Sequence, residues 1–123
     1  MNAFMNLFTK TQESYKTVDC SELEAIIGKD GNFQLIDVRT EGEHASGHIP
    51  NSENINLMSP SFVSKLEFLD REKEYYVYCA SGNRSKTACS QMVNMGFANV
   101  SNVRMGMMGW SGGGGQTHEA ICE

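Results

Sequence analysis

The segment from Tyr75 to Ser85 does most to limit what this chain can fold into. It opens with Tyr-Tyr-Val-Tyr, a run of aromatic and β-branched residues that predicts a strand ending at Cys79. A short loop with one glycine and one arginine follows, and the apolar positions after it predict a helix over residues 85–95. This order places a cysteine at the end of a strand and opposite the start of a helix.

The same layout makes Cys79 a candidate nucleophile. Backbone N–H groups of the loop and the positive end of the helix dipole would meet at its sulfur, and both favour thiolate over thiol. Arg84 adds a permanent positive charge with a planar geometry suited to an anion. The alternatives are a buried structural cysteine and a surface arginine at a helix start. The helix dipole disfavours an arginine there, so the anion-binding interpretation is preferred.

The composition limits the size and the partners of the protein. The chain has 123 residues, of which 40% are hydrophobic and 20% are charged, values that are ordinary for one globular domain. Its formal net charge is −5, and the acidic residues are spread along the chain. Nucleic acids and anionic membranes need clustered lysine and arginine, so neither is expected as a partner.

The cysteines show neither a disulfide pattern nor a metal pattern. They are Cys20, Cys79, Cys89 and Cys122. Their spacing is wide and irregular, without a C-x-x-C pair or a zinc pattern that includes histidine, so no metal site is expected. We interpret them as reduced thiols of a cytoplasmic protein, with Cys89 packed in the core.

The two ends of the chain differ in composition from its centre. Residues 1–14 include a short apolar run, interrupted by asparagine, that fits neither a signal peptide nor a membrane span. Successive glycines at 112–115 mark a flexible boundary near the other end. We therefore expect an N-terminal extension over 1–14, one domain over 15–112 and a flexible tail over 113–123.

Strand and helix patterns alternate between these ends. Strands are predicted at 15–18, 33–38, 55–57, 75–78 and 100–103. Helices are predicted at 21–27, from about 59 to 66 and at 85–95, with one helical turn at 106–110 and a mixture of helix and turn at 39–50. Asp19 or Ser21 would cap the first helix. The alternation predicts an α/β fold with a mostly parallel sheet.

Further motifs lie on both sides of the cysteine loop. In chain order they are Leu35-Ile36-Asp37-Val38-Arg39, Glu43, Gly47-His48-Ile49-Pro50, Val77-Tyr78-Cys79 with the loop to Arg84-Ser85, and Gly106 to Trp110. Their combination and spacing over residues 15–112 resemble those of the single-domain rhodaneses. The resemblance implies a rhodanese-like three-layer sandwich, in which helices flank a central, mostly parallel five-stranded sheet.

The resemblance also implies sulfur transfer. In rhodaneses the loop cysteine attacks the outer, sulfane sulfur of a donor such as thiosulfate, becomes a persulfide, and passes that sulfur to cyanide or a thiol. Cys79 would then be the nucleophile and the persulfide carrier. The implied donor is a small sulfur-containing anion or a protein persulfide, the implied acceptor is a thiol, and no cofactor is implied.

Family roles carry over to the residues around Cys79. The substrate-binding positions are Ala80, Ser81, Gly82, Asn83, Arg84 and Ser85. Their backbone amides would stabilise the thiolate and the terminal persulfide sulfur, while Arg84 would orient an anionic donor and favour departure of sulfite. Asp37 and Arg39 would support the strand end and the cysteine loop through hydrogen bonds. His48 would be structural rather than catalytic, with its ring bonded to backbone in a turn.

Two other functions stay open. The related cysteine phosphatases place five residues between cysteine and arginine, whereas this chain has four and lacks a convincing general acid. A persulfide carrier or binding module for a protein partner is the second alternative. Ala80 stands where active thiosulfate enzymes often have a basic residue and Ser81 is neutral, so Arg84 is the only cation inside the loop. This departure leaves the sulfur donor open.

Overall fold

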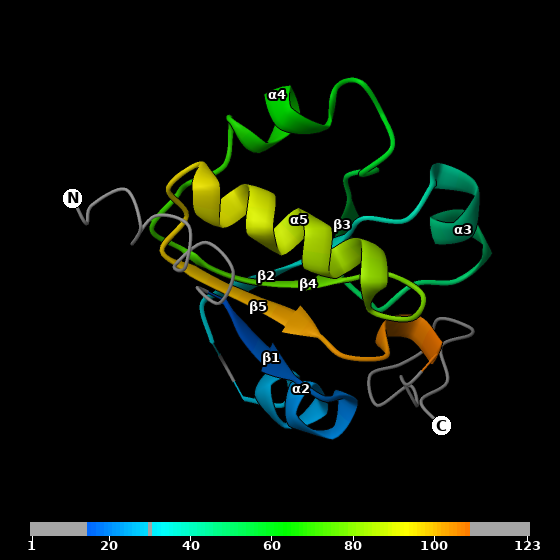
Figure 1. Ribbon diagram of the computed structural model, residues 1–123. Coiled ribbons are helices and arrows are strands. Elements are labelled where there is room, and N and C mark those ends of the chain that lie inside the picture. The colour runs from blue at the N-terminus through cyan, green and yellow to red at the C-terminus, as the bar shows by residue number, and fades with distance from the viewer. Residues whose placement is uncertain (1–14, 30, 109–123) are drawn as a thin grey trace.

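The structure is a computed structural model that describes residues 15–29 and 31–108. Its strands are β1 (Lys16–Val18), β2 (Phe33–Asp37), β3 (Ser52–Asn54), β4 (Glu74–Tyr78) and β5 (Asn99–Val103). They form one sheet in the order β1-β5-β4-β2-β3, and every neighbouring pair is parallel (Figure 1). The predicted α/β fold with a parallel five-stranded sheet is therefore confirmed.

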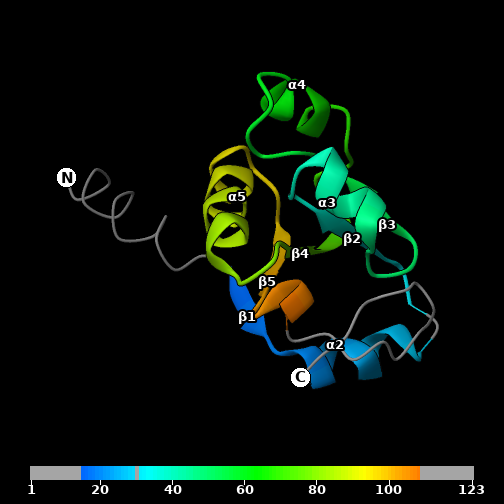
Figure 2. The same cartoon turned by 90° about the vertical axis from the view of Figure 1, so that its right-hand side faces the viewer.

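Helices cover both faces of this sheet. They are α2 (Cys20–Ile27), α3 (Glu41–Ser46), α4 (Phe62–Leu66) and α5 (Asn83–Asn94), followed by the 3-10 helix η1 (Gly106–Met108). Two views show α2 on one face and α4 with α5 on the other (Figure 1, Figure 2). These layers are those of the predicted sandwich.

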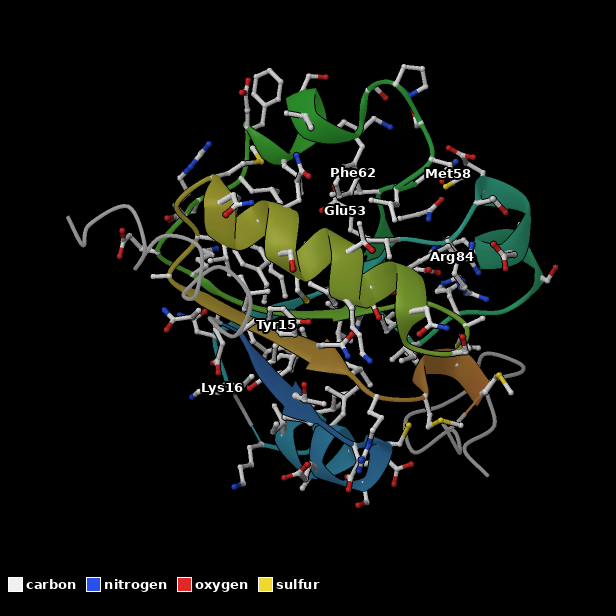
Figure 3. All side chains as sticks on the ribbon, viewed as in Figure 1. Tyr15, Lys16, Glu53, Met58, Phe62 and Arg84 are labelled. Carbon is white, nitrogen blue, oxygen red and sulfur yellow. The ribbon has the colours of Figure 1, made fainter. Side chains whose placement is uncertain are left out.

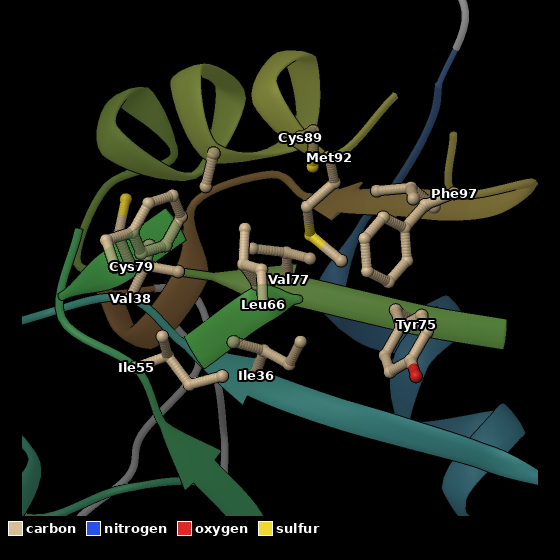
Figure 4. Packing of buried hydrophobic residues seen from close by; sticks show 13 residues of the cluster. Ile36, Val38, Ile55, Leu66, Tyr75, Val77, Cys79, Cys89, Met92 and Phe97 are labelled. Carbon is tan, nitrogen blue, oxygen red and sulfur yellow. The ribbon is translucent and has the colours of Figure 1, made fainter. Parts of the chain in front are cut away.

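Side chains from β4 and from Cys79, the residue after it, point alternately to the two faces of the sheet. They contribute to both halves of the core. Tyr75, Val77 and Cys79 face α4 and α5 in one buried cluster, which Figure 4 shows from close by. Tyr76 and Tyr78 face α2 in the other cluster. Because both faces of this central strand are buried, it is a firm support for the loop that follows it.

The two longer helices begin in different ways. At α2, Asp19 accepts a hydrogen bond from the Glu22 N–H at 2.9 Å, and its own N–H donates to Glu22 Oε1 at 2.8 Å. This capping box confirms Asp19 as the cap. Helix α5 begins at Asn83 rather than at Ser85, and its N-cap is Gly82, which has no side chain to offer. The N–H groups at the start of α5 are therefore left for another partner.

The strand predicted at 55–57 is wrong, because the third strand lies at Ser52–Asn54. The N–H groups of Ile55 and Leu57 still donate to carbonyl oxygens at the end of the β2 segment, at 2.9 and 3.0 Å, but without regular pairing. Ile55 and Leu57 are apolar because their side chains pack in the core. Strand β3 is a polar edge strand that forms through backbone pairing with β2.

Several predicted segments lie outside the described residues, namely the N-terminal extension, the tail with Cys122, and Trp110. Within the described part of the chain, no helix has both the length and the hydropathy that crossing a bilayer requires.

Candidate active site

Cys79 follows β4 directly, at the carboxyl edge of the sheet, and only 1% of its surface is exposed. Its side chain lies on the side of the sheet that α5 covers, in the same cluster as Val38 and Ile55 (Figure 4). Ligand sites of open parallel sheets are found at this edge, beyond the ends of the strands. The sulfur is therefore placed between the sheet and the start of α5.

Hydrogen-bond donors of the cysteine loop (residues 79–85) surround the Cys79 sulfur. The sulfur accepts hydrogen bonds from the Gly82 N–H at 3.1 Å and the Ser85 N–H at 3.3 Å, and the Ser85 hydroxyl oxygen lies 3.5 Å away. Gly82 has a φ of +101°, a conformation that residues with side chains rarely adopt. The glycine therefore allows the turn that directs its N–H at the sulfur.

These donors lower the pKa of the Cys79 thiol. Burial raises this pKa, but hydrogen bonds from the Ser85 hydroxyl and from the N–H groups of Ser85, Gly82 and Ser81 outweigh burial. The pKa of Cys89 moves the other way, because burial and then the nearby charge of Cys79 raise it. Of these two core cysteines, only Cys79 has a lowered pKa, which favours the thiolate form.

Arg84 binds a carboxylate. Its Nη1 and Nη2 atoms donate to Glu43 Oε1 at 2.8 Å and to Oε2 at 3.0 Å, and Figure 3 shows Arg84 beside α3. The hydrogen bond from Arg84, opposed by burial and helped by donors of Thr40, lowers the pKa of Glu43 to about 2. Glu43 is therefore ionised, and it compensates much of the positive charge of Arg84.

Asp37 and Arg39 form a buried ion pair near this carboxylate. Arg39 Nη2 donates to Asp37 Oδ2 at 2.7 Å and to Gly47 O at 2.8 Å, and Nε donates to Asp37 Oδ1 at 2.9 Å. His44 Nδ1 lies 2.8 Å from Asp37 Oδ2. These contacts hold the end of β2 against α3, the helix that carries Glu43. The pair is thus linked to the cysteine loop through α3 and the contact of Glu43 with the loop arginine.

His48 lies in the turn after α3. Its ring stacks on the His44 ring with centroids 3.8 Å apart, and its Nδ1 lies 2.8 Å from the His44 carbonyl oxygen. Such a contact with backbone is typical of a structural histidine rather than of a catalytic one.

The short helix η1 holds the cysteine loop from the other side. The carbonyl oxygens of Cys79 and Ala80 accept hydrogen bonds from the N–H groups of Met107 and Met108, at 2.8 and 2.9 Å. Gly106 lies so close that a Cβ atom there would be 1.9 Å from the Cys79 oxygen. Only glycine fits this approach, so the Gly106 segment contributes to the site by supporting the loop backbone.

The other predicted loop residues contribute little side-chain chemistry. Ser81 and Asn83 are exposed, and Ala80 is half-buried and apolar. Of the predicted loop positions, Gly82 and Ser85 donate backbone N–H groups to the sulfur and the Ser85 hydroxyl lies beside it, whereas Arg84 is directed at Glu43.

Two contacts in the site were not predicted from the sequence, although Glu43 itself stands among the motifs that carry the family resemblance. Glu43 contacts Arg84 across many intervening residues, and its capping box with Thr40 indicates only a helix start. Asn102 on β5 accepts a hydrogen bond from the Ser85 hydroxyl at 2.5 Å. The one available signal was an asparagine inside a predicted strand, since a buried amide needs a partner.

No metal centre accompanies these residues in the described ranges. Over residues 15–29 and 31–108, no three His, Cys, Asp or Glu side chains converge as a metal ion would require. The donor set around Cys79 can stabilise an anionic sulfur by itself.

Comparisons with known proteins agree with one another. The sequence model of the family described as Rhodanese-like domain matches residues 19–112. The Bacillus subtilis (strain 168) protein named "Putative sulfurtransferase YtwF" is 39% identical over 97 residues, which cover 79% of this chain and 91% of that protein. A protein of Allochromatium vinosum named "Sulfurtransferase" is 28% identical over 94 residues, which cover 76% of this chain and 86% of that protein.

The comparison with solved structures agrees with the sequence comparisons. The crystal structure of a rhodanese-like domain protein from Staphylococcus aureus has a TM-score of 0.71 and 30% identity, over 77% of this chain and 90% of that one. The matched region includes the Asp37–Arg39 pair, the cysteine loop and η1. The chain therefore belongs to the rhodanese-like domain family.

Proposed function

We propose that the protein is a sulfurtransferase or sulfur carrier in which Cys79 holds sulfane sulfur as a persulfide. The observation that carries this proposal is the donor set at the Cys79 sulfur, where two backbone N–H groups converge on a buried atom that lies beside the Ser85 hydroxyl. Such donors stabilise an anionic sulfur without a cofactor or a general base. The names of the two bacterial relatives, which both contain the word sulfurtransferase, agree with this role.

The reaction consists of two displacements at sulfur. The Cys79 thiolate attacks the sulfane sulfur of the donor, a bond forms between that sulfur and Sγ, and the bond from the sulfane sulfur to the rest of the donor breaks. The electron pair leaves with the donor, as sulfite from thiosulfate or as thiolate from an organic persulfide. An acceptor thiolate or cyanide then attacks the terminal sulfur, and the Cys79 thiolate leaves. The loop donors stabilise the charge on Sγ at both ends of this cycle.

The charge around the sulfur favours a persulfide donor over thiosulfate. Arg84 is the only cation of the cysteine loop, and Glu43 binds it through both carboxylate oxygens. Thiosulfate brings two negative charges to the reacting centre, where it meets little net positive charge, whereas the perthiolate group of a persulfide donor brings one. We infer that a persulfide on a protein or on a small thiol is the preferred class of donor.

Turnover with two donors tests this proposal. With cyanide as the acceptor, we expect enzyme-dependent thiocyanate formation from glutathione persulfide, and from thiosulfate with a higher KM. Cys79→Ser should abolish both reactions, whereas Cys89→Ala, which removes another thiol of the same core, should retain both. Turnover that survives in Cys79→Ser would contradict the proposal, and so would release of phosphate from p-nitrophenyl phosphate without any sulfur transfer.

A further inference from the structure

Asn102 is a buried amide with an incomplete set of hydrogen bonds. Its neighbour Val100, two residues earlier in β5, packs in the cluster that contains Cys79, so Asn102 faces the same side of the sheet. Asn102 is 0% exposed, and its Nδ2 group has no hydrogen-bond partner among the residues that the structure describes. A buried N–H group without a partner costs free energy, so an unpaired one calls for an explanation.

Asn102 is one end of a chain of three side chains that leads to the nucleophile. Asn102 Oδ1 lies 2.5 Å from the Ser85 hydroxyl oxygen, which lies 3.5 Å from the Cys79 sulfur. When Cys79 is a thiol, its S–H donates to the hydroxyl oxygen and the hydroxyl donates to Oδ1. A thiolate has no proton to give and needs a donor instead. The Ser85 hydroxyl can turn its proton toward the sulfur. Its oxygen then faces Asn102 Oδ1, which is only an acceptor and cannot donate a hydrogen bond to it.

A half-turn of the Asn102 amide supplies this donor. The amide oxygen and nitrogen exchange places with almost no change in shape. Nδ2–H then donates to the Ser85 oxygen, and the unpaired buried atom is a carbonyl oxygen instead of an N–H group. An unpaired carbonyl is the less costly of the two. The Asn102 amide therefore fits with Oδ1 toward Ser85 when Cys79 is a thiol, and with Nδ2 toward Ser85 when Cys79 is a thiolate.

We propose that Asn102 is a positioning residue of the active site, whose amide turns with the charge on the Cys79 sulfur. With Nδ2 toward Ser85, it directs the hydroxyl proton at Sγ. In sulfur transfer, which this part of the inference takes from the proposed function, Sγ is negative when it attacks the donor and again when it leaves the persulfide. Asn102 thus stabilises the attacking and the leaving thiolate through Ser85.

The pH profile of Cys79 alkylation by iodoacetamide, followed by peptide mass, tests this role without a sulfur donor. We expect Asn102→Leu to slow alkylation near neutral pH roughly tenfold and to move the profile to higher pH, since a hydrogen bond to a charged sulfur is lost. Ser85→Ala should slow alkylation to a similar extent. In the double variant, Asn102→Leu should slow it little further, because Asn102 acts through the Ser85 hydroxyl. Ser85→Thr, which keeps the hydroxyl, should retain the wild-type profile.

Ser101→Ala is the matched control, because Ser101 is a buried polar residue of the same strand on the face toward α2. We expect its profile to match that of the wild type. Two results would overturn the proposal. One is that Asn102→Leu slows Cys79 alkylation equally in the presence and in the absence of the Ser85 hydroxyl, and the other is that it does not slow alkylation at all.

A measurement on the unmodified protein keeps the test independent of variants that fold poorly. The side-chain amide resonances of Asn102 should shift with pH at the same midpoint as Cys79 alkylation. Resonances that stay constant across that midpoint would overturn the proposal. Neither measurement uses sulfur transfer, so a normal switch in a protein that transfers no sulfur would count against the proposed function alone.

Discussion

At the scale of single residues, the site stabilises negative charge on one sulfur mainly through neutral donors. Cys79 receives two N–H groups and lies beside a hydroxyl, whereas the guanidinium of Arg84 is directed at Glu43. Neutral donors favour the thiolate at short range but exert little attraction on a charged substrate at a distance. Stabilisation of an anionic sulfur and attraction of a charged substrate are thus separate properties of this site.

Removal of the Glu43 charge should therefore improve the capture of thiosulfate. We expect Glu43→Gln to lower the KM for thiosulfate roughly fivefold, because Arg84 is then no longer neutralised by a carboxylate. Steady-state thiocyanate formation at low ionic strength measures this effect. Glu41→Gln is the matched control, since Glu41 is an exposed acid of the same helix that contacts Asn56 at 3.1 Å. A KM that stays unchanged or rises in Glu43→Gln would show that Glu43 does not limit the binding of anions.

At the scale of elements, the turn between β5 and η1 carries unusual backbone. Met105 has a φ of +69° and Gly106 a φ of +45°. Glycine is required at position 106 by the close approach to the Cys79 carbonyl. Met105 has a Cβ atom, so its left-handed conformation costs about 1–2 kcal/mol. The turn persists because the N–H groups of Met107 and Met108 are fixed on the carbonyl oxygens of the cysteine loop.

Met105→Gly should relieve this strain. We expect the free energy of unfolding to rise by about 1 kcal/mol, because the relief exceeds the entropic cost of glycine and the half-exposed side chain gives up little packing. Urea denaturation measures the change. Asn51→Gly is the control, since Asn51 has the same φ of +69° but asparagine tolerates it better, so a smaller gain is expected. A lower stability of Met105→Gly would be the contrary result.

Local pattern was enough to predict the strand, loop and helix around Cys79. The strand before Cys79, the loop and the helix after it were predictable because propensity, glycine placement and burial agree over a short stretch. The edge strand β3 was not, because pairing with β2 overrides the weak strand propensity of Ser-Glu-Asn. The partners Glu43 and Asn102 were not predictable for a related reason: each contact joins residues far apart in the chain, and no spacing encodes it.

At the scale of the whole molecule, the Glu43–Arg84 contact joins α3 to the start of α5. The pKa of Glu43 is about 2 in the folded protein, against an ordinary value of 4.5. A carboxyl whose pKa is lower in the folded state stabilises that state above the unfolded value, and the contribution is lost as pH falls toward the folded value. The contact therefore adds stability at neutral pH that disappears in acid.

The stability difference between the wild type and Glu43→Gln should follow this pH dependence. We expect a difference of up to about 1 kcal/mol above pH 5, small because the pair is partly exposed, and a progressive decrease toward pH 2. Urea denaturation at a series of pH values measures it. A difference that is constant over this range would contradict the ion pair as its source.

The most direct test of Cys79 as a sulfur carrier is the intact mass of the protein after incubation with glutathione persulfide and, separately, with excess thiosulfate. We predict that the wild type gains one sulfur, about 32 Da, that cyanide or a thiol removes, and that Cys79→Ser gains none. Glutathione persulfide should load the protein more completely than thiosulfate. Absence of the gain with both donors, or an equal gain in Cys79→Ser, would contradict the central claim.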